Sequence, residues 1–368
     1  MILHIGKFFP PFFGGIEKVN YDIVKGLNLK GYKSDVICYN HKNGNFSEDK
    51  KKYIIYRTNV IFHFFGQPIS VDFVIKLKNI INKYEILHLH LPNPFAAFFT
   101  LLFIKNQKLV LHWHNDIVKQ KLFLFFYYPI LNRLLKRADK IIGTSENYIN
   151  NSKILKKFKL KCNVVPIGIS ADDVPEDKNF TKELKKIYRG KKIILSVGRL
   201  SKYKGFSYLI SSIKYLDKNE HLIIIGKGEE ESVLKKLVSK LKLNSRVEII
   251  SNVEYSRLGS YYSLCDVFCM SSISRNEGFG IVQLEAMLYS KPIITTDIPG
   301  SGITFGNIND KTGFVIPIKD DIKIAKAIKN ILYGGKTNFF KKNSLKRVEN
   351  VFSKEKMILN VINLYDNL

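Results

Sequence analysis

Short apolar runs alternate with helical patterns through the first half of the chain. After the first run, apolar residues recur at helical spacing from Ile16 to Leu27, and Gly31 supplies a C-cap. Strands that alternate with helices predict a parallel sheet with helices on both faces. The strands expected in this half are Ile2–Ile5, Asp35–Tyr39, Ile86–Leu89, Leu109–Leu111, Lys140–Gly143 and Cys162–Val165.

The alternation restarts after a polar stretch, Ser170–Lys191, which we interpret as a connection between domains. The sequence therefore predicts an α/β protein of two doubly wound parallel-sheet domains, residues 1–169 and 170–352, with a cleft between them. The tail from Arg347 to Tyr365 carries apolar residues at helical spacing. The expected strands are Lys192–Val197, Leu222–Ile225, Arg246–Ile250, Asp266–Met270 and Pro292–Thr296, and the helices are Phe206–Leu216, Glu229–Leu241, Tyr255–Leu264, Ile281–Leu288 and Ile322–Leu332.

The composition fits this picture and adds a strong positive charge. The 368 residues are 45% hydrophobic and 25% charged, which suits two domains with separate cores. The formal net charge of +27 favours nucleic acid, anionic lipid or phosphorylated substrates as partners, and lysine content alone does not separate them. A bias toward Lys, Ile and Asn codons explains part of that charge.

The cysteines and the apolar runs indicate a cytoplasmic protein. Cys38, Cys162, Cys265 and Cys269 are scattered, without a C-x-x-C spacing, and the first residues lack the layout of a signal peptide. We therefore expect reduced thiols. The longest apolar runs are shorter than the roughly 20 residues that span a bilayer.

The segment Arg275–Met287 combines a strand end, a glycine-flanked aromatic residue and the start of a helix. Free N–H groups and the macrodipole at a helix start favour an anion. Glu277 precedes this start and Glu285 lies about two turns inside, so their carboxylates are at most roughly 12 Å apart. That separation suits the two ends of a nucleotide sugar. The competing interpretation is a loop acid and a helix acid that are both simply solvated.

A second segment, Ser196–Gly205, places Arg199 and Lys204 on the loop after an expected strand. Doubly wound folds bind ligands at that edge of the sheet. The sequence has no D-x-D motif for a metal, so a leaving diphosphate would need fixed cations and backbone dipoles. Otherwise these residues are two solvated cations in a lysine-rich protein.

Candidates in the first domain are weaker. Gly14 and Gly15 lie between the first strand and the first helix, where glycines let the backbone approach a ligand closely. His114 and Ser145 each follow an expected strand. His88, His90, His112 and His114 form two H-x-H pairs that raise the possibility of zinc, but no third ligand stands at a diagnostic spacing, so we expect no metal.

The two glutamates with seven residues between them resemble the E-x7-E element of retaining GT-B glycosyltransferases of family 4. Gly198–Gly205 is similar to the family's GRL-x3-KG element. The resemblance implies the GT-B fold, with an acceptor-side first domain, a donor-binding second domain and a C-terminal helix, residues 353–368, that packs back on the first. The site residues that it implies are Arg199 and Lys204 on the donor diphosphate, Glu285 on the ribose, Glu277, Gly278, Phe279 and Gly280 on the donor sugar, Asn252 and Val253 near the nucleobase, Gly14, Gly15 and Ser145 on the acceptor side, and His114 at the reaction centre.

The implied activity is transfer of a hexose from a GDP- or UDP-linked donor to a glycan acceptor. The acceptor is expected to be lipid-linked, and the pathway to be cell-surface polysaccharide or lipopolysaccharide assembly. No cofactor and no metal are expected. The loop Asp297–Thr304 lacks the acid of the family's Gly-Gly-x-x-Glu run and resembles that of an O-antigen subset, which favours GDP-mannose slightly. The alternatives are a basic nucleic-acid-binding protein, for which no motif is present, and a non-catalytic partner subunit.

The stretch Lys119–Lys140 mixes clustered Phe, Tyr and Leu with basic residues such as Arg133 and Lys136. Basic residues beside an aromatic-rich helix suit an anionic membrane surface, which would place the protein on the inner face of the cell membrane. Equally, the apolar face could belong to the core and the basic face to solvent. Pro129 interrupts the pattern.

Overall fold

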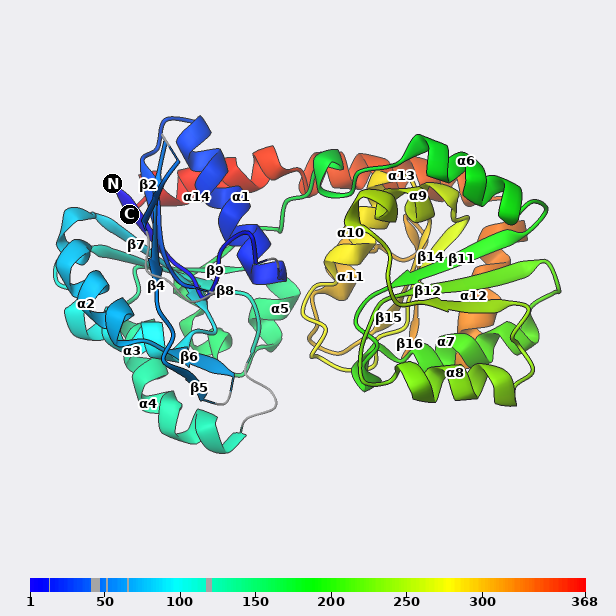
Figure 1. Ribbon diagram of the computed structural model, residues 1–368, viewed down its shortest axis with the longest axis horizontal. Helices are drawn as coiled ribbons and strands as arrows, with labels where there is room; N and C mark the ends of the chain where they lie inside the picture. The colour runs from blue at the N-terminus through cyan, green and yellow to red at the C-terminus, as the bar shows by residue number, and fades with distance from the viewer. Residues whose placement is uncertain (13, 41–46, 51, 65, 117–120) are drawn as a thin grey trace. The chain divides into compact units, whose positions relative to one another are not determined.

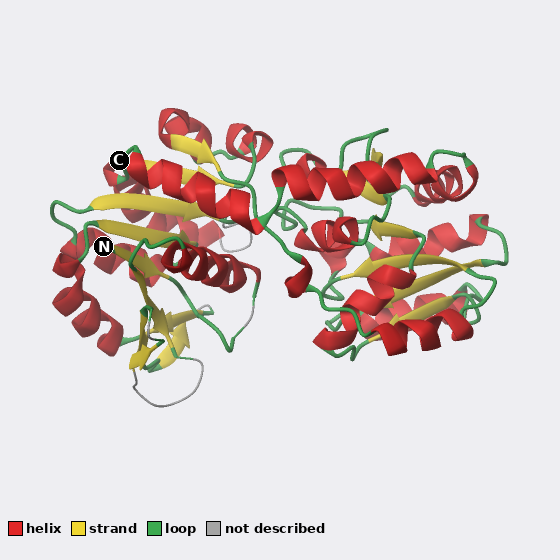
Figure 2. Cartoon of the chain, turned by 90° about the horizontal axis from the view of Figure 1, so that it is seen from above, coloured by secondary structure: helices red, strands yellow, loops and turns green. Residues whose placement is uncertain are grey.

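A computed structural model describes the chain apart from residues 13, 41–46, 51, 65 and 117–120 (Figure 1). It contains two compact units. The first comprises Met1–Gly168 and Lys354–Leu368, and the second comprises Ile169–Ser353. Each unit has a central parallel sheet with helices on both faces, which Figure 2 shows by secondary structure.

The sheet of the first unit has the strand order β10-β9-β8-β7-β1-β2-β4-β3. Its pairs are parallel, except that β3 runs antiparallel to β4. The order reverses between β1 and β7, so this is the switch point of the sheet. The strands are β1 (Ile2–Ile5), β2 (Ser34–Tyr39), β3 (Ser47–Asp49), β4 (Ile54–Thr58), β7 (Ile86–Leu91), β8 (Lys108–Trp113), β9 (Lys140–Gly143) and β10 (Cys162–Val164), beside a hairpin of β5 (Phe62–Phe64) and β6 (Gln67–Ile69).

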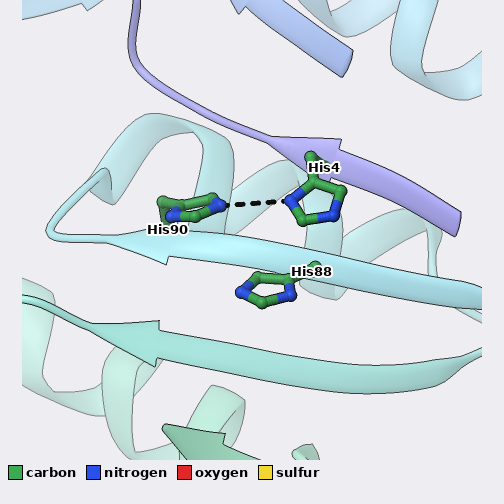
Figure 3. A group of neighbouring side chains, drawn as sticks. All are labelled: His4, His88 and His90. Carbon is green, nitrogen blue, oxygen red and sulfur yellow. Dashed lines mark hydrogen bonds between the residues drawn. The ribbon is translucent and has the colours of Figure 1, made fainter. Parts of the chain in front are cut away.

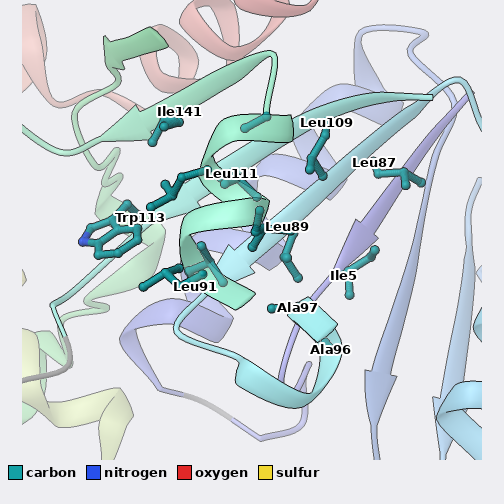
Figure 4. Close-up of a cluster of buried hydrophobic side chains, with 14 of the residues drawn as sticks. Ile5, Leu87, Leu89, Leu91, Ala96, Ala97, Leu109, Leu111, Trp113 and Ile141 are labelled. Carbon is teal, nitrogen blue, oxygen red and sulfur yellow. The ribbon is translucent and has the colours of Figure 1, made fainter. Parts of the chain in front are cut away.

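Alternate residues of the central strands point to opposite faces of this sheet. Leucines, isoleucines and Trp113 form the apolar core on one face, under helices α2 (Val71–Ile80), α3 (Pro94–Phe103) and α4 (Lys121–Arg137) (Figure 4). Burying each such side chain stabilises the fold by about 1.5–3 kcal/mol. Histidines occupy the opposite face of β1, β7 and β8.

The face with the histidines is covered by the first and last helices of the chain, α1 (Gly15–Leu29) and α14 (Lys354–Asp366). Lys354 Nζ pairs with the buried Asp22 of α1 at 3.2 Å, and Lys30 reaches Glu355 at 3.3 Å. Tyr365 of α14 is buried against His88 of the sheet. The C-terminal helix is thus part of the first unit.

The second unit has the strand order β13-β12-β11-β14-β15-β16, with parallel pairing throughout. Here the order reverses between β11 and β14. The strands are β11 (Lys192–Val197), β12 (Glu220–Ile225), β13 (Val247–Ile250), β14 (Val267–Met270), β15 (Ile293–Asp297) and β16 (Gly313–Pro317). The helices are α6 (Lys178–Ile187), α7 (Phe206–Ser212), α8 (Glu231–Lys240), α9 (Tyr255–Leu264), α10 (Ile281–Leu288), α11 (Ile303–Gly306), α12 (Asp321–Tyr333) and α13 (Thr337–Val351).

One expectation about connections was wrong. The polar stretch from Ser170 belongs to the second unit and contains helix α6, which buries Leu184 and packs on α9. Asp177 caps the start of this helix by accepting from two backbone N–H groups at 3.0 Å. The expected C-terminal helix, residues 353–368, agrees with α14. The chain breaks before it, after α13, at Phe352, whose ring is buried against Phe279 and Phe305.

Among the described residues, no helix is both long enough and apolar enough to cross a membrane. The stretch proposed for a membrane surface, Lys119–Lys140, lies partly outside the described residues, at 119 and 120. The described end of α4 buries Tyr127, Leu131 and Leu134 in the core and exposes Arg133 and Lys136. For this part of the helix, the apolar face therefore belongs to the core.

Candidate active site

The loops that follow β11 and β14 meet at the switch point of the second unit. Ile273 N donates to Tyr203 O at 2.8 Å, and Ser271 Oγ donates to Lys204 O at 3.1 Å. Gly205 has φ +65°, and a Cβ there would lie 2.2 Å from the carbonyl oxygen of Ser271. Only glycine fits this left-handed, crowded position, so the glycine lets the two loops join.

A buried ion pair results from this junction. Lys204 Nζ lies 2.5 Å from Glu277 Oε2, and the two side chains are only 9% and 10% exposed. Ser272 Oγ also donates to Glu277 at 2.9 Å. Arg199, on the loop after β11, is exposed and has no ion-pair or hydrogen-bond partner for its guanidinium within the described chain. The site therefore combines the paired Lys204 ammonium and Glu277 carboxylate with the exposed guanidinium of Arg199.

The loop before α10 is held from two sides. Gly280, with φ +75°, is the N-cap of α10. The buried ring of Phe279 packs on Phe305 and Phe352. The backbone is braced by the loop after β15, because Ser301 Oγ donates to Glu277 O at 2.7 Å and Gly302 N donates to Gly278 O at 2.8 Å. The positive end of the α10 dipole therefore lies at the same edge of the sheet as Arg199.

Glu285 lies within α10, where its carboxylate accepts a hydrogen bond from Tyr262 Oη at 2.7 Å. Burial raises the pKa of the Glu285 carboxyl above its ordinary value. Asn252 is exposed and Val253 is half-buried after the edge strand β13, two strands away from β11. The structure thus brings Lys204 and Glu277 together and leaves Asn252 and Val253 apart from them.

The candidates of the first unit have different surroundings. Gly14 is the N-cap of α1, and Gly15 is its first residue. Ser145 is fully buried, and its hydroxyl accepts from Tyr148 N at 3.1 Å, which caps α5 (Glu146–Asn151). His114 follows β8 and is 6% exposed, and burial lowers the pKa of its imidazole to about 3. His114 is therefore neutral at physiological pH.

Sequence reasoning missed three contacts of these sites. Ser272 and Tyr262, which hydrogen-bond the two glutamates, stand in no recognisable motif. His4 lies beside the H-x-H pairs, and its ring stacks on His88 at 4.5 Å. Its place between the core residues Leu3 and Ile5 is a signal that it faces away from the leucines.

Two family descriptions match this chain: Glycosyltransferase Family 4 over residues 13–173, and Glycosyl transferases group 1 over residues 177–347. The chain belongs to the family 4 glycosyltransferases. This glycosyltransferase is 28% identical to the O-antigen chain mannosyltransferase C of Escherichia coli over 369 residues, which span 100% of this chain and 98% of the relative. It is 25% identical to the D-rhamnosyltransferase WbpZ of Pseudomonas aeruginosa over 317 residues, with 86% and 82% coverage.

Solved structures share its fold. The sucrose-phosphate synthase of Thermosynechococcus elongatus has a TM-score of 0.80 at 20% identity, covering 100% of this chain and 98% of that one. HepE of Anabaena, in complex with UDP, has a TM-score of 0.79 at 18% identity, with full coverage of both chains. The glycosyltransferase therefore has the expected GT-B fold, and the family prediction from the sequence is confirmed.

Proposed function

We propose that this glycosyltransferase is a retaining hexosyltransferase that uses a GDP- or UDP-linked sugar, with GDP-mannose slightly favoured. The proposed acceptor is a lipid-linked glycan in O-antigen or related polysaccharide assembly. The observation that carries the proposal is the buried Lys204–Glu277 pair at the switch point, beside the exposed Arg199. The two relatives above, a mannosyltransferase and a rhamnosyltransferase, support a hexose donor.

Breaking the anomeric bond leaves negative charge on the diphosphate, and fixed positive groups stabilise that charge. Arg199 has its guanidinium free for this role in the described chain. Lys204 Nζ has further N–H groups besides the one that faces Glu277, and it lies beside Gly198 at the end of β11. The N-terminus of α10 adds its dipole. We propose that transfer therefore needs no metal ion.

The two glutamates have distinct proposed roles. Glu277 accepts hydrogen bonds from hydroxyls of the hexose, while Lys204 and Ser272 keep its carboxylate in place. Glu285 accepts from the ribose and is oriented by Tyr262. The backbone of Gly278–Gly280 contributes further contacts, because the bracing from Ser301 fixes its position.

The first unit would bind the acceptor through the loop at Gly14 and Gly15. Burial lowers the pKa of His114 to about 3, which makes its imidazole a weak base, so we propose that it hydrogen-bonds a sugar hydroxyl rather than acting as the general base. The departing phosphate then takes the proton of the acceptor hydroxyl. The net charge of +27 favours work at an anionic membrane face, and salt-sensitive sedimentation with anionic vesicles tests this location.

The first test is thermal stabilisation by UDP, GDP, ADP and NAD, followed by transfer from the sugar donor whose base is selected. A nucleotide at 100 times its Kd adds about 2.7 kcal/mol. For a unit of this size that raises Tm by roughly 5–10 °C. We expect stabilisation by one nucleoside diphosphate, and no stabilisation by any of the four would contradict the proposal.

Variants then locate the effect. Arg199→Ala and Lys204→Ala should abolish transfer and weaken the nucleotide shift, because both remove positive charge from the diphosphate. Lys202→Ala is the matched control, since Lys202 is an exposed cation in the same turn as Lys204. Wild-type turnover in Arg199→Ala, or equal losses in Lys202→Ala, would refute the assigned roles. Activity that EDTA abolishes would refute the metal-free mechanism.

A further inference from the structure

The most unusual feature of the first unit is a cluster of buried histidines at its switch point. They come from three adjacent strands: His4 from β1, His88 and His90 from β7, and His112 with His114 from β8 and its end. The register aligns His4 with His88 and His90 with His112. Figure 3 shows His4, His88 and His90 gathered on one face, with His4 hydrogen-bonded to His90. Apart from His114, nothing in the proposed reaction uses them.

These imidazoles and the hydroxyl of Tyr365 make an unbroken series of hydrogen bonds, here called the histidine chain. The series begins at His114, crosses to β1, passes through the C-terminal helix and returns to β8. Its links are His114 Nε2 to His90 Nδ1 at 3.0 Å, His90 Nε2 to His4 Nδ1 at 3.2 Å, His4 Nε2 to Tyr365 Oη at 3.5 Å, Tyr365 Oη to His88 Nδ1 at 2.5 Å, and His88 Nε2 to His112 Nδ1 at 3.2 Å.

A neutral imidazole has one N–H donor and one bare nitrogen that accepts. Every inner histidine of the chain uses both nitrogens, and each link needs one donor and one acceptor. If one ring carries its hydrogen on Nε2, its neighbour must present a bare Nδ1, so that neighbour also carries its hydrogen on Nε2. The hydroxyl of Tyr365 keeps the same donor-to-acceptor direction along the chain, because it accepts from the ring on one side and donates to the ring on the other. Two arrangements satisfy all links: every ring Nε2–H, or every ring Nδ1–H.

The neutral state of the rings agrees with their burial. Removal from water lowers the pKa of His4 to about 3 and depresses the pKa of His88, His90 and His112 in the same direction. A proton that entered at His114 would also find no exit. At the far end, His112 Nε2 is buried without a hydrogen-bond partner among the described residues. The chain therefore fixes hydrogen positions and does not conduct protons to solvent.

The same rings raise the question of a metal ion, because the ligand atoms of two triads lie within 4.8 Å of one another. A bound metal lies close to the plane of each imidazole, at about 2.0–2.1 Å for zinc. One pair in each triad is stacked instead: His88 on His90 at 4.7 Å and 17°, and His112 on His114 at 4.2 Å and 9°. Parallel planes at that separation share no such point, so the geometry favours hydrogen bonding over coordination.

We infer that the histidine chain holds its imidazoles in one shared tautomer, and that Tyr365 is a positioning residue that sets which nitrogen of His114 carries hydrogen. In one state, His114 presents a bare Nδ1 that accepts from a substrate hydroxyl. In the other state, it presents an Nδ1–H that donates to a substrate oxygen. The shared tautomer stands on the hydrogen bonds alone, whereas the effect on transfer rests on the proposed function.

The test is nitrogen NMR of the full chain labelled with 15N-histidine, which distinguishes the protonated nitrogen of each ring from the bare one. Single histidine variants assign the signals. At neutral pH we expect the same tautomer in His4, His88, His90, His112 and His114. Different tautomers within the chain, or an imidazolium among its members, would overturn the inference. Addition of Zn²⁺ should leave these signals in place, and coordination that shifts His90, His112 and His114 together would replace our inference with a metal site.

Tyr365→Phe removes the hydroxyl that joins the two halves of the chain, after which His88 and His112 need not follow His114. Tyr32→Phe is the matched control, because its hydroxyl contacts Asp366 of the same helix outside the chain. We expect mixed tautomers and a kcat on the order of fivefold lower, with little change in donor KM, in Tyr365→Phe alone. An unchanged spectrum would overturn the coupling. A changed spectrum with unchanged kcat would overturn the positioning role and leave the shared tautomer standing.

Discussion

Acid should unfold the first unit of this glycosyltransferase far more readily than it would an ordinary domain, because the unit buries neutral histidines. The folded-state pKa of His4 and of His114 is about 3, against 6.5 for the free side chain. The unfolded chain therefore binds protons first as the pH falls. The stabilisation is complete above about pH 6.5 and is lost progressively between about pH 6.5 and pH 3.

The size of the loss follows from linkage. For each such histidine, the free energy of unfolding falls by about 1.4 kcal/mol for every pH unit below 6.5. At pH 5, His4 and His114 together remove roughly 4 kcal/mol. His88, His90 and His112 shift in the same direction and add to this loss. A domain is stable by about 5–15 kcal/mol, so the first unit should unfold at a much lower urea concentration at pH 5 than at pH 7.

Urea unfolding at pH 7 and pH 5, followed by tryptophan fluorescence, measures this loss. The single tryptophan, Trp113, is buried in β8 next to His112 and so reports on the first unit. His112→Asn removes one ring whose pKa is depressed by burial, so it should reduce the loss between the two pH values. His63→Asn, at an exposed position of β5, should leave the loss unchanged. Equal urea midpoints at pH 7 and pH 5, or an undiminished loss in His112→Asn, would refute the reasoning.

Three further predictions concern the second unit. Lys204→Met leaves the buried carboxylate of Glu277 without its ion-pair partner and should lower the free energy of unfolding by about 3–5 kcal/mol, measured by urea unfolding with circular dichroism. The control Lys235→Met breaks an exposed ion pair on α8 and should lower it by under about 0.5 kcal/mol. Burial raises the folded-state pKa of Glu285, so the ionised carboxylate opposes folding. The Tm of Glu285→Gln should therefore exceed that of the wild type above the ordinary pKa range of glutamate and equal it below that range. Gly205→Ala places a Cβ 2.2 Å from a neighbouring carbonyl oxygen at φ +65° and should lower the Tm by roughly 3–10 °C, and an unchanged Tm would contradict the loop junction described here.

The elements of the second unit could be predicted well because its buried strands are uninterrupted apolar runs. The expected bounds of Lys192–Val197, Tyr255–Leu264 and Ile281–Leu288 agree with β11, α9 and α10. Helix α6 was missed because most of its residues are solvated and its identity depends on the cap at Asp177. Helix α3 was missed because it is apolar almost throughout, so its residues show no helical period.

The candidate site was predictable in its membership but not in its contacts. Motifs name Arg199, Lys204 and Glu277, yet the direct bond between the lysine and the glutamate depends on how two loops from separate strands join. The H-x-H pairs predict two histidines on one face of each strand. The register between strands, which brings His4 to the same place, is a property of tertiary pairing and leaves no local signal.

Both units are doubly wound, and both carry their polar side chains at the switch point, but the chemistry differs. In the second unit, the switch point holds Lys204 and Glu277, and the guanidinium of the exposed Arg199 has no partner among the described residues. Charge of that kind suits a phosphorylated ligand. In the first unit, the polar groups there are neutral imidazoles whose hydrogens are shared along a chain that ends at His114. Neutral donors and acceptors discriminate among hydroxyls at little cost in desolvated charge. If the proposed function holds, the recognition of the diphosphate is therefore ionic, and the selection of sugar hydroxyls depends on the Glu277 carboxylate and on which nitrogen of His114 carries hydrogen.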